Sequence, residues 1–313
     1  MKNIYNPSVK NIDKAVDILK NGGNIVMPTE TVYGLAGIAN NNKAVAQIYN
    51  IKNRPEFNPL IAHCCDIEMV EKIAVINDMA RKVLNHFNRG SITIVLPSKD
   101  NTNLSKLGCA GLDTVAIRIP NNKICNEIIR KCGFPLFAPS ANYSGGISPT
   151  KAEHVYKSLG NKVDMILDGG ASSVGIESTI IDLSNDKPAI LRAGAITQDE
   201  LEKFIGIALV ERTFAKGNNP IAPGQLKSHY KPKKKLFINI EKPNSKQAFL
   251  GYGDCEDCFI NLSKNGDLVE VASNLFDALY KADESEFNEI AIAPIPNYGI
   301  GIAINDKIKR ASV

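Results

Sequence analysis

The chain of 313 residues has no tryptophan, few aromatic residues (6%) and no apolar run long enough to span a membrane. Its first residues lack the apolar core of a secretory signal. Its seven cysteines are an odd number and are scattered, which is typical of a reducing compartment. These absences argue against a membrane protein and against a disulfide framework, and they predict a cytoplasmic protein without membrane contact.

A large excess of charge is also lacking. The formal net charge is +4, with hydrophobic residues at 44% and charged residues at 22%. This composition is typical of a globular protein of one large or two ordinary domains. The small positive charge is compatible with an anionic substrate or a weak contact with tRNA, but it does not predict a dedicated nucleic-acid binder.

The common signatures of nucleotide and metal sites are absent too. There is no Gly-x-x-x-x-Gly-Lys-Ser/Thr loop and no dinucleotide fingerprint after a strand. Gly299 and Gly301 are more typical of a tight turn than of a cofactor loop. Cys255 and Cys258 have no second pair, and no metal-ligand spacing relates the histidines, which are His63, His86, His154 and His229. We therefore expect no metal site built from protein ligands, and any nucleotide must be held by another arrangement.

Helical and extended patterns alternate through the first two hundred residues. Apolar residues follow a helical period over 11–21, and Gly22-Gly23 ends that segment. Residues 92–96 and 114–119 are rich in β-branched residues and predict strands. The mixed order predicts an α/β sheet covered by helices.

A break in the pattern follows residue 206. Residues 207–235 contain prolines, glycines, asparagines and a lysine run, which predict a linker. A strand at 236–240 and an amphipathic helix at 268–282 then predict a second, smaller α/β domain. We expect a first domain over 1–206, a linker over 207–235 and a second domain over 236–313.

Two cations stand at the end of a predicted helix over 43–52. One explanation of Lys52 and Arg54 is a solvated helix terminus, where cations favour the dipole. The other is convergence on a polyanion, because arginine offers a fork to phosphate oxygens and lysine a point charge. Taken alone, the solvated terminus is the commoner case.

Other motifs are equally ambiguous in isolation. The polar loop 138–146 suits either a ligand or an ordinary surface turn. Ser178 and Thr179 place hydroxyl groups at the start of an apolar strand, where buried hydroxyls need partners. Arg118 within one strand and Arg192 after another each need an anion, either a protein carboxylate or a substrate.

The order of the motifs is more specific than any one of them. These segments succeed one another along the chain: Pro28-Thr29-Glu30-Thr31-Val32-Tyr33-Gly34-Leu35, Lys52-x-Arg54-Pro55, Asn58-Pro59-Leu60, Ser140-Ala141-Asn142, Glu177-Ser178-Thr179-Ile180 and Leu191-Arg192. The series closely resembles the YrdC-like family. Segments 222–232, 261–268 and 299–306 resemble the linker and C-terminal domain of its longer members, the threonylcarbamoyl-AMP synthases. The resemblance covers essentially the whole chain.

The resemblance implies a fold, a reaction and partners. The fold would be a twisted mixed α/β sheet with helices around a basic cavity, plus a small Rossmann-like domain. The activity would be that of a nucleotidyltransferase that converts L-threonine, bicarbonate or carbon dioxide, and ATP, accompanied by Mg²⁺, into threonylcarbamoyl-AMP and pyrophosphate. A separate tRNA threonylcarbamoyl transferase would then use that product to make N6-threonylcarbamoyladenosine in tRNA.

The resemblance also implies residue roles. The L-threonine site would contain Thr31, His63, Arg118 and Ser178, with Arg118 on the carboxylate. ATP would be bound chiefly at its phosphates by Lys52, Arg54, Ser140, Asn142 and Arg192, of which Lys52 and Arg54 are the expected catalytic pair. Secondary ATP contacts would come from Asn58, Thr114 and Thr150, and Tyr230 of the linker would fold over the nucleotide as a lid.

Two departures and two alternatives accompany this assignment. Arg89-Gly90-Ser91 stands where the family commonly has Pro-Gly-Pro, and Ala193 stands where it often has proline. One alternative function is a double-stranded RNA-binding module, against which the low net charge argues. The other is a carbamoyl-transfer enzyme of the hydrogenase-maturation type, but the chain lacks room for its acylphosphatase and zinc-finger segments.

Overall fold

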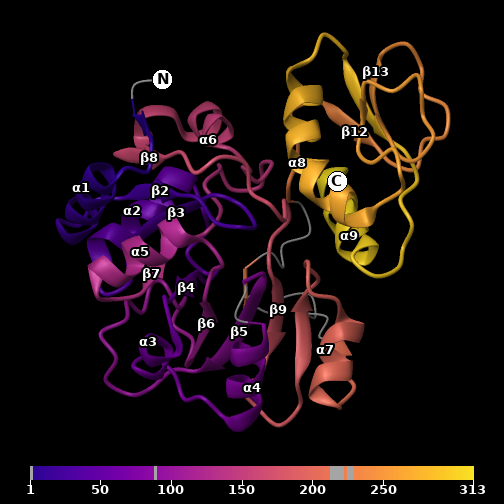
Figure 1. Ribbon diagram of the computed structural model, residues 1–313. Coiled ribbons are helices and arrows are strands. Elements are labelled where there is room, and N and C mark those ends of the chain that lie inside the picture. Colours follow the sequence, from indigo (N-terminus) through magenta and orange to yellow (C-terminus); the bar gives the residue numbers. More distant parts are fainter. Residues whose placement is uncertain (1–2, 88–89, 212–221, 224–228) are drawn as a thin grey trace.

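Two sheets form the framework of the computed structural model, which describes residues 3–87, 90–211, 222–223 and 229–313 (Figure 1). Within these residues the larger sheet has eleven strands. In spatial order they are β1 (Ile4–Tyr5), β8 (Met165–Leu167), β2 (Ile25–Met27), β3 (Gly34–Ile38), β7 (Leu136–Phe137), β4 (Ile61–His63), β6 (Thr114–Arg118), β5 (Ile92–Pro97), β9 (Thr179–Asp182), β10 (Ala189–Arg192) and β11 (Val210–Glu211). Parallel and antiparallel pairs both occur, so the predicted mixed α/β sheet is confirmed.

Seven α-helices of the described residues surround this sheet. They are α1 (Val9–Lys20), α2 (Asn42–Lys52), α3 (Ile67–Glu71), α4 (Asp78–His86), α5 (Lys123–Cys132), α6 (Ala152–Leu159) and α7 (Gln198–Ile205). Local sequence sets their starts, because Ser8, Asn41 and Asn122 accept hydrogen bonds from the first turns of α1, α2 and α5. None of the described helices has the length and hydropathy needed to cross a membrane.

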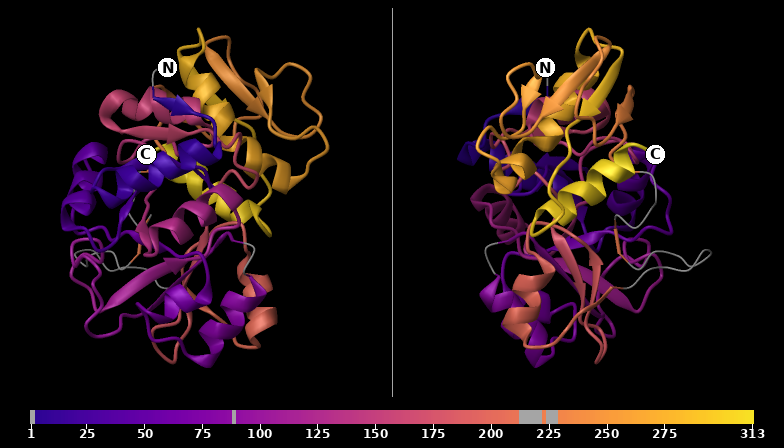
Figure 2. Two further views of the ribbon diagram at one scale, coloured as in Figure 1. Left: turned by 60° about the vertical axis from the view of Figure 1, so that its left-hand side comes forward. Right: turned by 90° about the vertical axis from the view of Figure 1, so that its right-hand side faces the viewer.

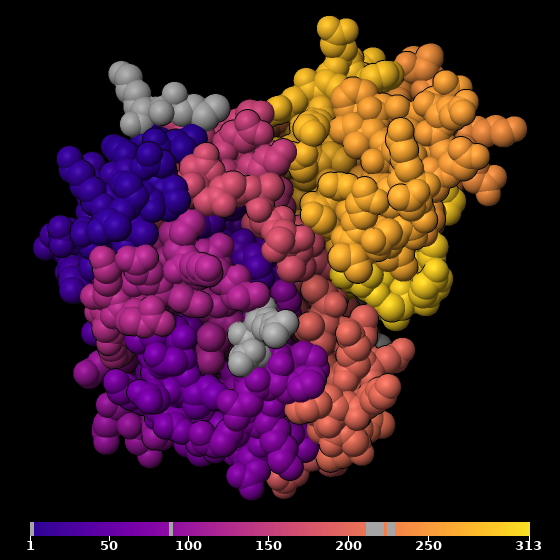
Figure 3. Space-filling model, in the orientation of Figure 1, coloured from indigo at the N-terminus to yellow at the C-terminus, as the bar shows by residue number. Residues whose placement is uncertain are grey.

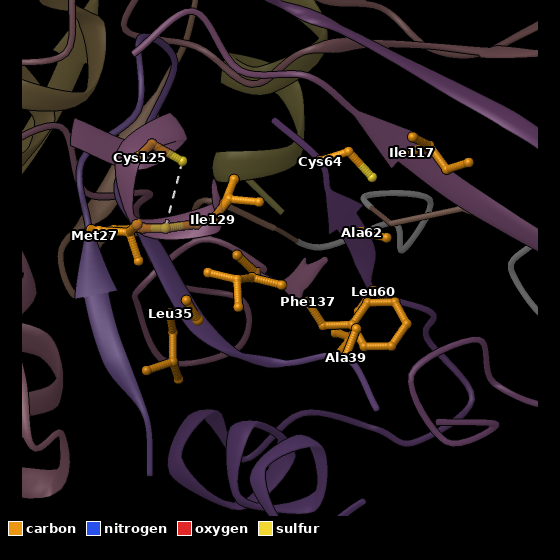
Figure 4. Close-up of a cluster of buried hydrophobic side chains, with 14 of the residues drawn as sticks. Met27, Leu35, Ala39, Leu60, Ala62, Cys64, Ile117, Cys125, Ile129 and Phe137 are labelled. Atoms are coloured by element: carbon orange, nitrogen blue, oxygen red, sulfur yellow. Dashed lines mark hydrogen bonds between the residues drawn. The ribbon is translucent and has the colours of Figure 1, made fainter. Parts of the chain in front are cut away.

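The main core packs against one face of the central strands. Ala62 of β4 and Ile117 of β6 lie in a cluster with Ile129 of α5 (Figure 4). Side chains alternate along a strand, so the neighbouring His63 and Arg118 face the other side of the sheet. That second face carries the cavity described below.

The second sheet belongs to the C-terminal part of the chain. Its described strands, β12 (Lys235–Phe237), β15 (Glu289–Ile292), β13 (Gln247–Gly251) and β14 (Ile260–Asn261), are all parallel. Helices α8 (Leu268–Glu284) and α9 (Gly301–Ala311) pack their apolar faces against it. Parallel strands linked through helices make this part Rossmann-like. Gly299, with φ of 54°, lies in the turn before α9, as the sequence predicts.

The two parts lie side by side, with the C-terminal part coloured orange to yellow (Figures 2 and 3). An ion pair of 2.7 Å joins Lys157 of α6 to Glu284 of α8. Of the predicted linker 207–235, the structure describes residues 207–211, 222–223 and 229–235. Val210 and Glu211 pair with β10, and Lys235 begins β12. The domain boundaries remain a prediction.

Candidate active site

One cavity lies on the sheet face opposite the main core. Its water-accessible volume is ≈ 50 Å³, which holds a few water molecules. Of the predicted site residues, five line it: Arg54, His63, Arg118, Ser140 and Arg192. The remaining lining residues are Thr29, Val32, Tyr33, Gly34, Ile61, Ala138, Pro139, Glu177, Pro223 and His229.

The predicted pair of cations is buried. Helix α2 ends at Lys52, and Asn53 follows in the left-handed conformation with φ of 51°. Continued helix would point residues two apart about 200° away from each other. The left-handed residue between them instead lets both side chains turn inward, so that Lys52 is 1% exposed and Arg54 is 8% exposed. The solvated helix terminus is therefore the wrong explanation.

Main-chain carbonyls hold these two cations. The Lys52 ammonium donates to the carbonyl oxygens of Ser140 and Asn142, at 2.6 and 2.5 Å. Arg54 donates to the carbonyl oxygens of Asn58 and Pro59, at 3.2 and 2.9 Å. Burial, with the charge of Arg54 second, lowers the pKa of Lys52 well below its ordinary value, and burial lowers the pKa of Arg54 to about 10. Because no carboxylate among the described residues pairs with either one, their charge favours an anionic ligand.

Arg118 has the protein carboxylate that its burial requires. Its Nη2 lies 2.7 Å from Oε1 of Glu30. The backbone N–H of Ser91 donates to the same oxygen at 2.8 Å. Ser91 has φ of 65°, a conformation closed to proline, which also has no N–H, so serine at this position gives Glu30 a second donor. Arg89, the other half of that departure, lies outside the described residues.

Part of the Arg118 fork remains open. Its Nε has no hydrogen-bond partner among the described residues. Burial would raise the pKa of Glu30, but the charge and hydrogen bond of Arg118, with backbone N–H groups, outweigh it and lower that pKa. The Glu30 carboxylate is therefore ionised at neutral pH.

His63 lies beside Arg118 on the neighbouring strand, in register with it. Burial, with the charge of Arg118 second, lowers the pKa of His63 to about 3, so the imidazole is neutral at physiological pH. Thr31 is fully buried, and its hydroxyl lies 3.0 Å from that of Thr29. Thr29 lines the cavity, a position that the sequence analysis missed.

Ser178 and Arg192 form a second buried group. Arg192 donates through Nε and Nη2 to the carbonyl oxygen of Ser178, at 3.0 and 2.9 Å, and to its hydroxyl at 3.1 Å. The Ser178 hydroxyl lies 2.7 Å from that of Thr93. Burial lowers the pKa of Arg192, and no carboxylate of the described chain lies within ion-pair distance of it. Glu177 and Asp306 act on Arg192 only through their charge, which partly opposes the effect of burial on its pKa.

Eight predicted residues do not line the cavity: Thr31, Lys52, Ser178 and Tyr230, and the four expected ATP contacts Asn58, Thr114, Asn142 and Thr150. Asn58 and Asn142 are 1% exposed, and each has a side-chain oxygen without a partner among the described residues. Thr114 lies at the opposite end of β6 from Arg118, about 13 Å along the strand. Thr150 does not cap α6, which begins at Ala152 without a side-chain cap. The ATP roles of these four residues remain predictions.

A linker residue lines the cavity, and the next residue packs against it. His229 is part of its lining, and Tyr230 packs edge-on against His229 with ring centroids 4.2 Å apart. Tyr230 is 1% exposed and stacks on Phe276 of α8 at 5.3 Å. Its φ of 66° is strained for a residue with a Cβ, by about 1 to 2 kcal/mol, so packing has to hold it there.

Glu177 is a second lining residue, besides Thr29, to which the sequence motifs assign no role. It lines the cavity and is 6% exposed. Its Oε1 accepts a hydrogen bond of 2.5 Å from the Ser148 hydroxyl, and its Oε2 has no partner among the described residues. The available signal was a carboxylate placed directly before two hydroxyl residues and an apolar strand, since such a group is costly to bury without a purpose.

Comparison with known proteins places this geometry in a family. A family model described as "Telomere recombination" (Sua5, YciO and YrdC proteins) matches residues 17–194. A second model, described as the C-terminal domain of threonylcarbamoyl-AMP synthase, matches residues 196–313.

Individual relatives extend over both parts. The threonylcarbamoyl-AMP synthase of Bacillus subtilis is 36% identical, with 96% of this chain and 92% of the relative covered. That of Pyrococcus abyssi is 34% identical, with 95% and 93% covered. The crystal structure of P. abyssi Sua5 complexed with L-threonine superposes with a TM-score of 0.88 at 31% identity, over 99% of this chain and 96% of that one. The chain therefore belongs to the threonylcarbamoyl-AMP synthase family, in its two-domain form.

Proposed function

We propose that this chain makes threonylcarbamoyl-AMP and pyrophosphate from L-threonine, ATP, and bicarbonate or carbon dioxide. The observation that carries the proposal is the meeting of Arg54, Arg118 and Arg192 on one buried cavity. Among the described residues, Arg118 alone of these three has a carboxylate partner. A buried site with such an excess of cations is suited to a substrate with several negative charges.

The amino-acid end of the site is assigned to Thr31, His63, Arg118 and Ser178. The free Nε of Arg118 supports a role in binding the L-threonine carboxylate, while Glu30 holds Nη2 of the fork. A neutral His63 can donate one hydrogen bond and accept another without repelling the substrate ammonium. Thr29 belongs to the same wall, because its hydroxyl contacts that of Thr31.

The phosphate end is assigned to Lys52, Arg54, Ser140, Asn142 and Arg192. The carbonyl-held cations fix positive charge before a triphosphate arrives, which avoids reorganisation during the reaction. Lys52 binds the carbonyl oxygens of Ser140 and Asn142 and does not line the cavity. It would therefore contribute by fixing the position of the loop that contains them and by the long-range effect of its charge. Asn58, Thr114, Thr150 and Tyr230 retain their expected ATP contacts as part of the proposal.

Mg²⁺ fits this end of the site. Glu177 offers an unpartnered, buried carboxylate oxygen, the ligand type that Mg²⁺ prefers beside phosphates. When bound with ATP, the ion would neutralise phosphate charge and help pyrophosphate to leave.

The reaction needs position and charge more than covalent help. The neutral amino group of L-threonine forms a C–N bond with carbon dioxide and loses a proton to solvent, or forms it with bicarbonate as water leaves, and becomes an N-carboxylate. An oxygen of that group bonds to the α-phosphorus of ATP as the bond to pyrophosphate breaks. Arg54 and Arg192 would stabilise the charge that moves onto pyrophosphate, and Arg118 would hold the amino acid in line.

The small volume of the cavity supports a step of opening and closing. A volume of ≈ 50 Å³ does not hold a nucleotide and an amino acid together, so the cavity has to open for substrates to enter. The proposed lid is Tyr230, which packs on the lining residue His229. Closure would then exclude water from the labile adenylate. We further propose a cytoplasmic location, hand-off of the adenylate to a separate tRNA threonylcarbamoyl transferase, and weak tRNA contact at most.

Pyrophosphate release tests the proposed function. With MgATP, release should require both L-threonine and bicarbonate. Arg118→Lys keeps the charge but loses the fork, so it should raise the KM for L-threonine at least about tenfold and change that for MgATP much less. Release without L-threonine, or tight binding of duplex RNA with no release, would contradict the proposal. Burial of the cations already argues against the RNA-binding alternative, because a duplex could not reach them.

A further inference from the structure

A short segment of the first domain, residues 147–150, lies between the second domain and the cavity wall. The hydroxyl of Tyr280 in α8 donates to the carbonyl oxygen of Ile147 at 2.8 Å. The next residue, Ser148, donates to Glu177. The carbonyl of Pro149 then accepts from the backbone N–H of Tyr33, a lining residue, at 2.8 Å. The segment therefore touches the second domain at one end and the cavity wall at its middle.

The far end of the segment is tied to α8 through His154. The backbone N–H of Thr150 donates to Nδ1 of His154 at 3.3 Å. Nδ1 is thus the acceptor, and the proton sits on Nε2, which lies 3.2 Å from Asp277 of α8. The Tyr280 ring stacks on the His154 ring, with centroids 4.0 Å apart and an angle of 13°.

This cluster is a docking contact rather than a metal site. Glu153, His154 and Asp277 lie close enough together to bind an ion. However, Asp277 already pairs with Lys151 at 2.7 Å and Lys281 at 2.8 Å, which satisfies its charge. The arrangement leaves Asp277 and Tyr280 as the two side chains by which α8 fixes the ends of the segment.

Helix α8 also touches the segment that leads into Glu177. Gly175 has φ of 81°, and a Cβ built on it would lie 2.4 Å from the carbonyl oxygen of Ala272 in α8. The backbone of the helix therefore touches the chain two residues before Glu177. The Glu177 side chain is thus held by Ser148, and its backbone follows a segment that packs on α8.

We propose that the second domain acts on the reaction by holding Glu177 in position through residues 147–150. Asp277 and Tyr280 are then positioning residues, which touch neither substrate nor Mg²⁺. The inference rests on the proposed function, in which Glu177 faces the phosphates and the ion. It gives the second domain a defined task at the phosphate end of the cavity.

Kinetics of matched α8 variants test this. Tyr280→Phe removes the hydroxyl on Ile147, and Asp277→Asn weakens the hold on His154. The control is Glu284→Gln, which weakens an α8 ion pair with Lys157 but leaves residues 147–150 untouched. The first two should lower kcat/KM for MgATP about 5- to 10-fold, the effect of one buried hydrogen bond, while L-threonine binding changes less than about twofold. The control should match the wild type.

Coupling supplies the decisive comparison. Ser148→Ala breaks the contact with Glu177, so Tyr280→Phe should have little further effect in that background. Independent effects of the two substitutions, or equal effects of Tyr280→Phe and Glu284→Gln, would overturn the inference. Hydrogen exchange gives a readout without turnover: protection at 147–150 and 176–178 should fall in Tyr280→Phe but not in the control. An inactive wild type would refute the proposed function, whereas the exchange result would still decide whether α8 holds the segment.

Discussion

Replacement of Lys52 by methionine tests stability and catalysis together. Methionine keeps most of the volume of the buried stem and removes the ammonium group. The sequence alone suggests a ligand-facing turn, where loss of the charge should abolish turnover with little effect on the fold. The structure changes that expectation, because the Lys52 ammonium binds two main-chain carbonyls in the interior.

The magnitude follows from those two hydrogen bonds. A buried acceptor left without its donor costs about 1 to 3 kcal/mol, so two carbonyls give about 2 to 6 kcal/mol. Removing a fully buried, unpaired cation returns part of this cost, since burial already disfavours the charged form. We expect a net loss of about 1 to 3 kcal/mol in the free energy of unfolding, and a fall of at least about 100-fold in turnover.

Urea unfolding and pyrophosphate release measure the two effects. The variant should unfold at a lower urea concentration with an unchanged slope, and should remain folded in buffer. Arg54→Ala is the companion, because its carbonyl partners lie within five residues of it, so it should lose activity with a smaller loss of stability. Wild-type stability in Lys52→Met would show that the ammonium does not hold the loop, and wild-type turnover would remove Lys52 from the catalytic assignment.

Two further predictions concern the proposed lid residue Tyr230 and the imidazole of His63. Tyr230→Ala should lower turnover by opening the cavity. It should also lower the free energy of unfolding by about 3 to 5 kcal/mol, because the ring packs on Phe276. Tyr230→Phe should retain most of the stability, and equal melting temperatures of the two variants would refute the packing argument. Truncation before residue 207 should impair turnover for the same reason. Full activity of the truncated chain would show that the proposed lid is dispensable. His63 has a folded pKa of about 3 against about 6.5 unfolded, so the unfolded chain binds more protons in that interval and stability falls as pH drops. Between pH 6.5 and 4.5 this amounts to about 2 kcal/mol. Over this pH interval, urea titrations should show that the free energy of unfolding falls by about 2 kcal/mol less in His63→Gln than in the wild type. Parallel plots of unfolding free energy against pH for the two proteins would refute the assignment.

Patterns that act over a few residues were readable in the sequence. The β-branched runs predicted β5 and β6, and the helical period of 11–21 predicted α1 within two residues at its start. The break after residue 206 and the amphipathic run before residue 283 indicated a second α/β unit, as the separate parallel sheet now confirms for the fold class. The motif order indicated the family, which the full-length relatives confirm.

Effects that depend on distant contacts were not readable. Strand β1 pairs with β8, 162 residues away at Ile4 and Ile166, and no local pattern specifies such a partner. The burial of Lys52 depends on a loop 88 residues further along the chain. The role of Glu177 depends on Ser148 and, through it, on a helix of the other domain. Strand direction explains why Thr114, close in sequence to Arg118, lies at the other end of β6.

The left-handed residue between the two cations limits how this chain can vary. Asn53 is exposed and lies outside the cavity lining, so its surroundings would suggest free substitution. Its φ of 51° is accessible at low cost to glycine, asparagine and aspartate, whereas β-branched residues are disfavoured there. Any replacement that restored a regular helix would swing Arg54 away from the phosphate end. Sequence drift at this surface position is therefore constrained by backbone geometry, and Arg54, the proposed catalytic cation, can be displaced by a substitution that touches neither it nor the substrate.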